Sequence, residues 1–332
     1  MAGTIRAGST RRHFLSTTAT AAAAFGAPHW ALAQSAYPNK PVRVIVPFPA
    51  GGTTDVVARL VLQKLGELMK ASFVVENKGG ANGIIGTEQV ARAPADGYTL
   101  LFNTGGAQTL SPVIYKAGYE AAASFEPIAK VCDVGFVVIA RKDLPVNSMQ
   151  ELIALAKKST DKPLTISSGS SMITLITEQF KRVIGAPHLI NAQYKGTSPQ
   201  MQAVVAGEVD FSFDSFASVE MIRAGRVKAL GVMLPHRAES FPQVPTFKEL
   251  GIKDMDFSSW AGMLAPKGTP KEIVQALAKG VDQVMQMPDV LAKLKTYDYV
   301  PTRITPEAFG KQLQAENDRW KQVVKDTGFK IE

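Results

Sequence analysis

The chain has 332 residues, of which 45% are hydrophobic and 20% are charged, and its formal net charge is +8. This composition is typical of a globular protein with room for two domains, and it excludes a disordered chain. The lysines and arginines are scattered along the chain and do not form runs, so we expect no nucleic acid as a partner.

The first 33 residues predict an export signal. Arg11 and Arg12, followed by Phe14, fit the twin-arginine pattern, and Ala31-Leu32-Ala33 is a small-x-small cleavage site. The Ala/Thr-rich segment between them is too weakly hydrophobic to span a bilayer, and no cysteine at the cleavage site could carry a lipid. We therefore expect a cleaved, periplasmic chain, whose formal charge falls to +8 − 3 = +5 with the loss of three arginines.

The stretch VRVIVPFPAGGTTD, Val42 to Asp55, predicts a buried strand that turns directly into a helix. Its β-branched residues are typical of a central strand, and from Val56 onward the apolar residues recur with a helical period. Thr53, Thr54 and Asp55 can cap this helix. Because a helix start leaves unpaired N–H groups under a partial positive charge, the turn can hold a ligand carboxylate. The alternative is that it is only a well-capped connection.

The rest of the first unit continues the alternation of strands and helices. We expect strands over Ser72–Glu76 and within Ala95–Phe102, a Gly-rich turn over Asn77–Gly83, a helix beginning at Ile84, and a Gly-rich loop over Asn103–Gln108. Short connections of this kind predict a parallel sheet with helices on its faces. Ligands collect at the carboxyl ends of such strands.

A second unit of the same class is expected from Val134. Its strand at Leu164–Ser167 runs through a Ser/Gly turn into another helix, which makes a second helix-start anion site. The chain is expected to return to the first unit with a strand at Phe257–Ala265. The other expected elements are strands over Val134–Ala140, Val209–Phe213 and Ala229–Leu234, a passage from strand to loop over Asn191–Thr197, and helices over Met149–Lys158, Pro199–Ala206, Lys271–Met287 and Pro306–Thr327.

Catalytic and cofactor motifs are missing from this sequence. After the export signal the only histidines are His188 and His236, which lack zinc-ligand spacing. Gly169-Ser170-Ser171 lacks the second glycine of a nucleophile elbow. The glycines of ENKGGANGIIG fit no nucleotide motif and predict a tight turn with close helix–sheet packing. Cys132 is the only cysteine, so no intrachain disulfide can form. We expect no metal, no cofactor and no enzymatic activity.

Six sequence blocks, spread over the chain, are rich in glycine and proline or carry distinctive polar residues. They are PFPAGGTTDVVARL, VVENKGGANGIIGTEQVARAPADGYTLLF, FEPIAKV, LPVNSMQELIALAKK, YKGTSPQMQAVVAGEVDFSFD and FPQVPTFKELG. These blocks resemble the Bug, or TctC-like, extracytoplasmic solute-binding proteins of tripartite tricarboxylate transporters. The resemblance covers essentially the whole mature chain in order.

This resemblance implies an α/β fold of the type II periplasmic binding proteins, with two lobes, a central ligand cleft and a hinge. On this basis we assign residues 34–134 and 258–332 to lobe 1 and residues 135–257 to lobe 2. The implied function is to capture a small organic carboxylate, namely a di- or tricarboxylate, an acidic amino acid or an aromatic carboxylate. The implied partners are the transporter's membrane subunits, and we expect a monomer.

The resemblance also implies which residues contact the ligand. They come from the first strand–helix turn of lobe 1 and from the turns and strand ends of lobe 2. They are Phe48, Ala50, Gly51, Thr53, Thr54, Asp55, Ser168, Gly169, Ser170, Tyr194, Gly196, Thr197 and Asp214. Capping is an alternative role for Thr54 and Asp55, and aromatic packing is one for Tyr194.

Two departures from the family pattern bear on the ligand. The lobe 2 turn is one residue shorter than usual, with Thr174 about where a histidine is common, and Ala192-Gln193 replaces the more usual Val-Pro. Two other functions stay open at this stage. One is a sensor that docks on a two-component kinase, and the other is an exported hydrolase or isomerase with Asp55 or Asp214 as its base.

Overall fold

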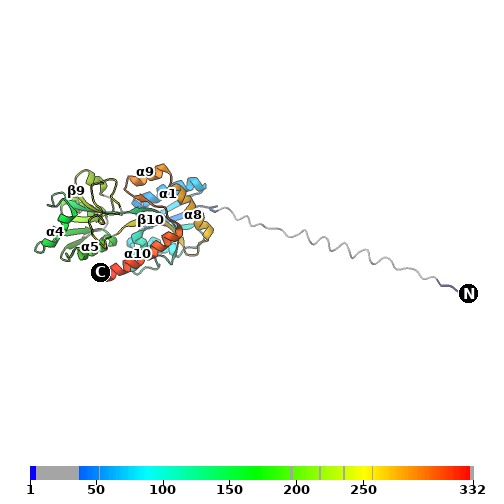
Figure 1. Cartoon of the computed structure of the whole chain (residues 1–332). Helices are drawn as coiled ribbons and strands as arrows, with labels where there is room; N and C mark the ends of the chain where they lie inside the picture. The colour runs from blue at the N-terminus through cyan, green and yellow to red at the C-terminus, as the bar shows by residue number, and fades with distance from the viewer. Residues whose placement is uncertain are drawn as a thin grey trace. The chain divides into compact units, whose positions relative to one another are not determined.

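The computed structural model describes residues 1–4, 37–51, 53–194, 197–216, 218–234, 236–255 and 257–329, without the side chain of Thr53. The chain separates into two units, residues 1–39 and residues 40–332, and the helices and strands of the described residues all lie in the second unit (Figure 1). The predicted export signal falls almost entirely outside the described residues, so it stays a prediction.

The first sheet is mixed and has six strands in the order β11-β4-β10-β3-β1-β2. Its first three strands in sequence are parallel, as predicted, because each is connected to the next through a helix on the sheet face. The later strands β4, β10 and β11 pair antiparallel. The strands are β1 (Val42–Val46), β2 (Phe73–Asn77), β3 (Thr99–Thr104), β4 (Phe125–Val134), β10 (Ser259–Pro266) and β11 (Val300–Pro301).

Helices from both ends of this unit cover the first sheet. They are α1 (Thr53–Met69), the 3-10 turn η1 (Ala81–Gly83), α2 (Ile84–Ala91), α3 (Ser111–Ile114), α8 (Lys271–Val284), α9 (Pro288–Lys295) and α10 (Pro306–Thr327). The loop expected over residues 103–108 is wrong: β3 continues to Thr104, and Gly106–Leu110 forms the π-helix η2, which runs directly into α3.

The second sheet has five strands in the order β7-β6-β8-β5-β9. The strands β6, β7 and β8 are mutually parallel, while β5 lies antiparallel between β8 and β9. Its strands are β5 (Phe136–Arg141), β6 (Thr165–Ser168), β7 (Ile190–Gln193), β8 (Phe211–Asp214) and β9 (Val227–Met233). Its helices are α4 (Met149–Lys158), α5 (Ser171–Ile184), α6 (Thr197–Ala206) and α7 (Val219–Arg223).

The chain crosses between the sheets at Gly135 and returns to the first sheet with β10, as predicted. A Cβ at Gly135 would lie 2.4 Å from the Cγ of Leu234, so this crossing has no room for a side chain. The two sheets therefore divide the chain at Gly135 and again before β10. The domain assignment itself stays a prediction.

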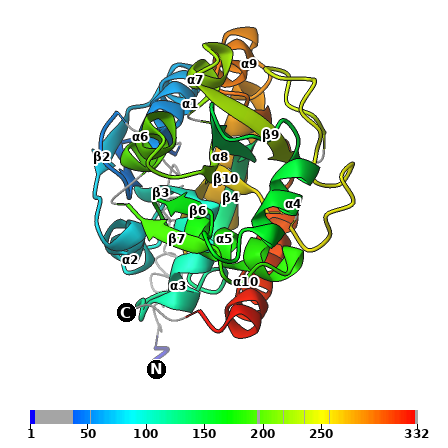
Figure 2. The same ribbon diagram turned by 90° about the vertical axis from the view of Figure 1, so that its left-hand side faces the viewer.

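Helix α10 packs against both halves of the second unit. Near its start, Phe309 packs edge to face on Trp260 of β10, with ring centroids 4.8 Å apart. Near its end, Trp320 stacks on Phe257 and joins the core that contains α5. Figure 2 accordingly shows α10 and α5 next to each other. The C-terminal helix α10 therefore packs against the cores of both sheets.

Candidate ligand-binding site

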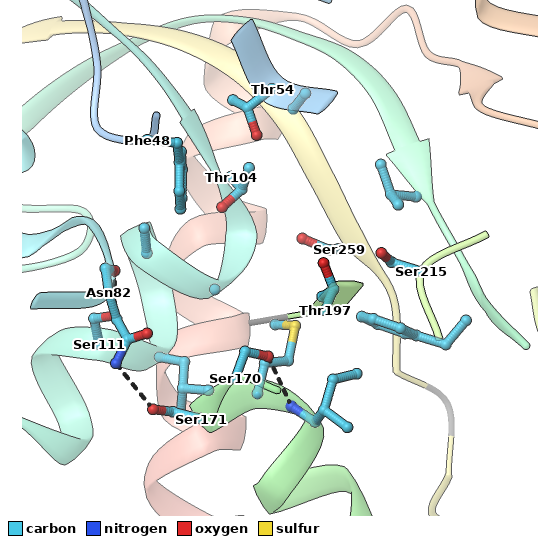
Figure 3. A pocket seen from close by; sticks show the side chains of 18 of the residues that line it. Phe48, Thr54, Asn82, Thr104, Ser111, Ser170, Ser171, Thr197, Ser215 and Ser259 are labelled. Atoms are coloured by element: carbon cyan, nitrogen blue, oxygen red, sulfur yellow. Dashed lines mark hydrogen bonds between the residues drawn. The ribbon is translucent and has the colours of Figure 1, made fainter. Parts of the chain in front are cut away.

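A pocket of about 340 Å³ lies between the two sheets and takes its walls from both of them. This volume suits a small molecule. Its polar wall consists of hydroxyl and amide side chains contributed by widely separated segments (Figure 3). These residues are Thr54, Asn82, Thr104, Ser111, Ser170, Ser171, Thr197, Ser215, Ser259 and Tyr299.

The pocket wall is uncharged over the part of the chain that the structure describes. Much of the remaining wall is hydrocarbon or aromatic, from Phe48, Val57, Leu110, Phe136 and Met172. A ligand that enters this pocket therefore meets neutral hydrogen-bonding groups and apolar surface. It does not meet a lysine or arginine among the described residues.

Three helices begin at this pocket. The first turn of α1 contributes Thr54, α5 begins at Ser171, and α6 begins at Thr197. The Ser170 hydroxyl caps α5 by accepting a hydrogen bond from the backbone N of Ile173 at 3.3 Å. Helix starts carry a partial positive charge and unpaired N–H groups, so their convergence favours an anionic ligand without a charged side chain.

A buried network holds the π-helix segment of the wall in place. The side-chain amide of Asn103 donates to Gln108 at 2.9 Å and to Thr87 at 3.2 Å, and Gln108 donates to the carbonyl of Ala121 at 2.6 Å. Asn103, Gln108 and Thr87 are fully buried. Short π-helical stretches often occur at functional sites, and this one supplies Ala107 and Leu110 to the wall.

Four residues predicted to contact the ligand line this pocket: Phe48, Thr54, Ser170 and Thr197. The other described ones are not among the residues that line it. These are Ala50, Gly51, Asp55, Ser168, Gly169, Tyr194 and Asp214. Gly196 and the side chain of Thr53 lie outside what the structure describes. The ligand contacts themselves stay a prediction.

The position of Asp55 favours the capping alternative. Its buried carboxylate accepts hydrogen bonds from the backbone N of Gly51 at 2.9 Å, from Arg59 at 3.0 Å and from Asn77 at 2.9 Å. Burial alone would raise the pKa of this carboxyl, but the bonds from Arg59, Gly51 and Asn77 outweigh it and lower the pKa. A carboxylate held in this way keeps the turn before α1 closed and is a poor general base.

Ser168, Tyr194 and Asp214 also serve the fold of the second sheet. The Ser168 hydroxyl is buried and donates to Asn191 at 2.7 Å, and Tyr194 packs beside that sheet's core. Asp214 is fully buried, and its Oδ2 accepts from the backbone N of Ser218 at 2.9 Å. Asp214, the second carboxylate considered as a base, is also not among the residues that line the pocket.

Several wall residues were not predicted from the sequence. Ser171 lies within the Ser/Gly turn that was predicted as a helix-start anion site, although it is missing from the predicted contact residues. Asn82 lies in a Gly-rich stretch that we assigned only to packing. Ser259 and Tyr299 carry no local signal, because they reach the pocket only through the return of the chain to the first sheet.

The described residues also bear on metal ligation and membrane spanning. They contain no group of three or more histidine, cysteine, aspartate or glutamate side chains placed to hold a metal ion. No helix among them has the length and hydrophobicity needed to cross a membrane.

Residues 57–329 match the protein family described as TctC, tripartite tricarboxylate transporter family receptor. The chain is 34% identical over 303 residues to protein BugT of Bordetella pertussis. The alignment covers 89% of this chain and 91% of BugT. Among solved structures, Rpa4515 of R. palustris with adipate is 32% identical with a TM-score of 0.78, covering 88% of this chain and 98% of that one.

A second solved structure, MatC of Rhodopseudomonas palustris with bound malate, is 29% identical with a TM-score of 0.75. The alignment covers 87% of this chain and 100% of MatC. The predicted two-lobed α/β fold of the periplasmic binding proteins is confirmed by these matches and by the two sheets described above. The chain therefore belongs to the TctC family of tripartite tricarboxylate transporter receptors, which confirms the resemblance seen in its sequence.

Proposed function

We propose that the protein is a periplasmic receptor that captures a small organic carboxylate and delivers it to the membrane subunits of a tripartite tricarboxylate transporter. The observation that carries this proposal is the convergence of the starts of α1, α5 and α6 on one uncharged pocket. Hydrogen bonds to a charged group contribute about 1.5–3 kcal/mol each, so four or five together contribute about 6–15 kcal/mol, a range that includes the roughly 8 kcal/mol of a micromolar complex.

The pocket favours a dicarboxylate without an amino group. Adipate and malate, the compounds named with two similar structures, both have this character. An ammonium group in the pocket would find no carboxylate among the described wall residues, and burying an unpaired charge is costly. The apolar wall around Phe48, Phe136 and Met172 suits the hydrocarbon part of a ligand such as adipate.

The test is ligand binding by the purified mature chain, using adipate, malate, citrate, benzoate and glutamate. We expect adipate or malate to raise the melting temperature and to give a saturable titration in calorimetry, with no product detected by mass spectrometry. Binding of none of these compounds would contradict the proposal, and turnover would point to the hydrolase or isomerase alternative.

The variant Thr54→Val tests the helix-start explanation, because valine keeps the shape of threonine and removes its hydroxyl from the wall. Its affinity for the bound dicarboxylate should fall by about 0.5–1.5 kcal/mol, the contribution of one hydrogen bond. The matched control is Thr160→Val at an exposed position after α4, which should leave the affinity unchanged.

A further inference from the structure

We propose that Asn82, Tyr115 and Ser171 form a clasp that closes the mouth of the pocket and slows the escape of the ligand. Asn82 and Tyr115 belong to the part of the chain that forms the first sheet, and Ser171 is the first residue of α5 on the second. This proposal rests on the proposed function, because it concerns the same pocket.

The three side chains are mutually hydrogen-bonded. The Asn82 amide donates to the Tyr115 hydroxyl at 2.5 Å and to the Ser171 hydroxyl at 3.2 Å, and the two hydroxyls are 2.7 Å apart. Figure 3 shows the bond between Asn82 and Ser171 at the edge of the pocket. Both bonds to Ser171 join residues of the first sheet's half to the second sheet's half, so the triad holds the two halves together.

The clasp lies between the pocket and solvent. Asn82 and Ser171 both line the pocket, yet Asn82 is exposed and Ser171 is half-buried. A side chain that touches both the pocket and solvent is at the opening. Separation of Asn82 from Ser171 would therefore open a path for the ligand, which makes these bonds a determinant of the dissociation rate.

The backbone at Asn82 is held in a position that serves this contact. Its φ of 51° and ψ of 38° are left-handed, a conformation that asparagine tolerates better than most residues. The Ser111 hydroxyl donates to the Asn82 carbonyl at 3.2 Å and so fixes the same residue from the pocket side. The substitution Asn82→Gly therefore removes the side-chain amide without straining the backbone, because glycine adopts the same conformation readily.

The first measurement is the distance between the two halves. Nitroxide labels at Gln63→Cys in α1 and Gln202→Cys in α6 occupy exposed positions, and Cys132 is buried and free. Double electron–electron resonance on the full mature chain measures the distance between the two nitroxide labels. This distance should be longer in Asn82→Gly and in Tyr115→Phe than in the labelled protein without these substitutions. The control Lys70→Gly, at another exposed left-handed position with φ 52°, should leave the distances unchanged.

The second measurement is the dissociation rate of adipate or malate, followed by stopped-flow tryptophan fluorescence. Removal of the Asn82 amide or the Tyr115 hydroxyl should speed dissociation about two- to tenfold, the effect of one net hydrogen bond. The double variant should be less than multiplicative, since both changes break one network.

Unchanged distances in both single variants would overturn the clasp. So would unchanged dissociation rates with an intact melting temperature. If neither carboxylate binds, the proposed function fails, but the distance measurement still decides whether the clasp holds the two halves together. The failures of the two proposals are therefore distinguishable.

Discussion

Replacing Asp55 by asparagine should destabilise the protein although Asp55 does not line the pocket. The carboxylate accepts from three donors, namely the backbone N of Gly51, Arg59 and Asn77. Asparagine has one acceptor oxygen, and its amide group would turn an N–H toward at least one of these donors. Charge-assisted hydrogen bonds contribute about 1.5–3 kcal/mol each. Because Arg59 is about half exposed, its share is discounted, and we expect a loss of about 2–4 kcal/mol.

The same variant has a defined pH dependence. The donors hold the pKa of the Asp55 carboxyl below its ordinary value of 3.8, so the folded state favours the ionised form. The stability that this provides is fully present above the unfolded pKa and is lost as the pH falls through the folded pKa. The gap between wild type and Asp55→Asn should therefore be largest near pH 7 and shrink below about pH 4.

Urea denaturation followed by circular dichroism at pH 7 and pH 3 measures both effects. The control is Asp161→Asn, an exposed aspartate near the end of α4, which should change the free energy of unfolding by less than about 0.5 kcal/mol. A loss below about 1 kcal/mol for Asp55→Asn at pH 7, or a gap that stays constant with pH, would refute the role given to this carboxylate.

Three further predictions concern other parts of the chain. Burial raises the pKa of the Glu316 carboxyl, although Trp260 donates to it, so the native state holds this proton more tightly than the unfolded state. The stability of wild type relative to Glu316→Gln should then fall as the pH rises from about 4 toward 7, and urea titrations showing the opposite slope would contradict this. Burial raises the pKa of the Cys132 thiol to about 12, so a thiol reagent should react with it only after unfolding in urea. Replacing Arg11 and Arg12 by lysine should leave precursor in the cytoplasm, and normal amounts of periplasmic mature protein in fractionation blots would contradict twin-arginine export.

The strand–helix turns were predictable because their signals are local. The β-branched run before residue 47 and the threonines after Gly51 lie within one short stretch, and the structure has β1 and α1 there. The Gly-rich segment ENKGGANGIIG was also predicted to allow close packing. A Cβ on its Gly86 would lie 2.7 Å from the carbonyl oxygen of Lys78, which is too close for a side chain. Such contacts depend on neighbours in sequence.

The wall of the pocket was only partly predictable because it is built from distant segments. The role of Asn82 depends on Ser171, 89 residues further along the chain. Asp55 and Asp214 follow the predicted strands, but each carboxylate accepts from a nearby backbone N–H group, and neither residue lines the pocket. Sequence position identified the correct ends of the strands and could not determine which side chains face the cavity.

Because the pocket wall is uncharged over the described residues, binding of a dicarboxylate depends on the distance between the helix starts that offer N–H groups. Each start offers N–H groups at a fixed place, and α1 belongs to one sheet's half while α5 belongs to the other. A dicarboxylate that contacts both starts gains its full binding energy only when the halves are together, so it favours that arrangement. The hydrogen bonds at Asn82 stabilise the same arrangement from the mouth of the pocket. Ligand binding and the clasp should therefore be cooperative: breaking the clasp should lower the affinity for the ligand, and removing the ligand should make the closed arrangement less stable.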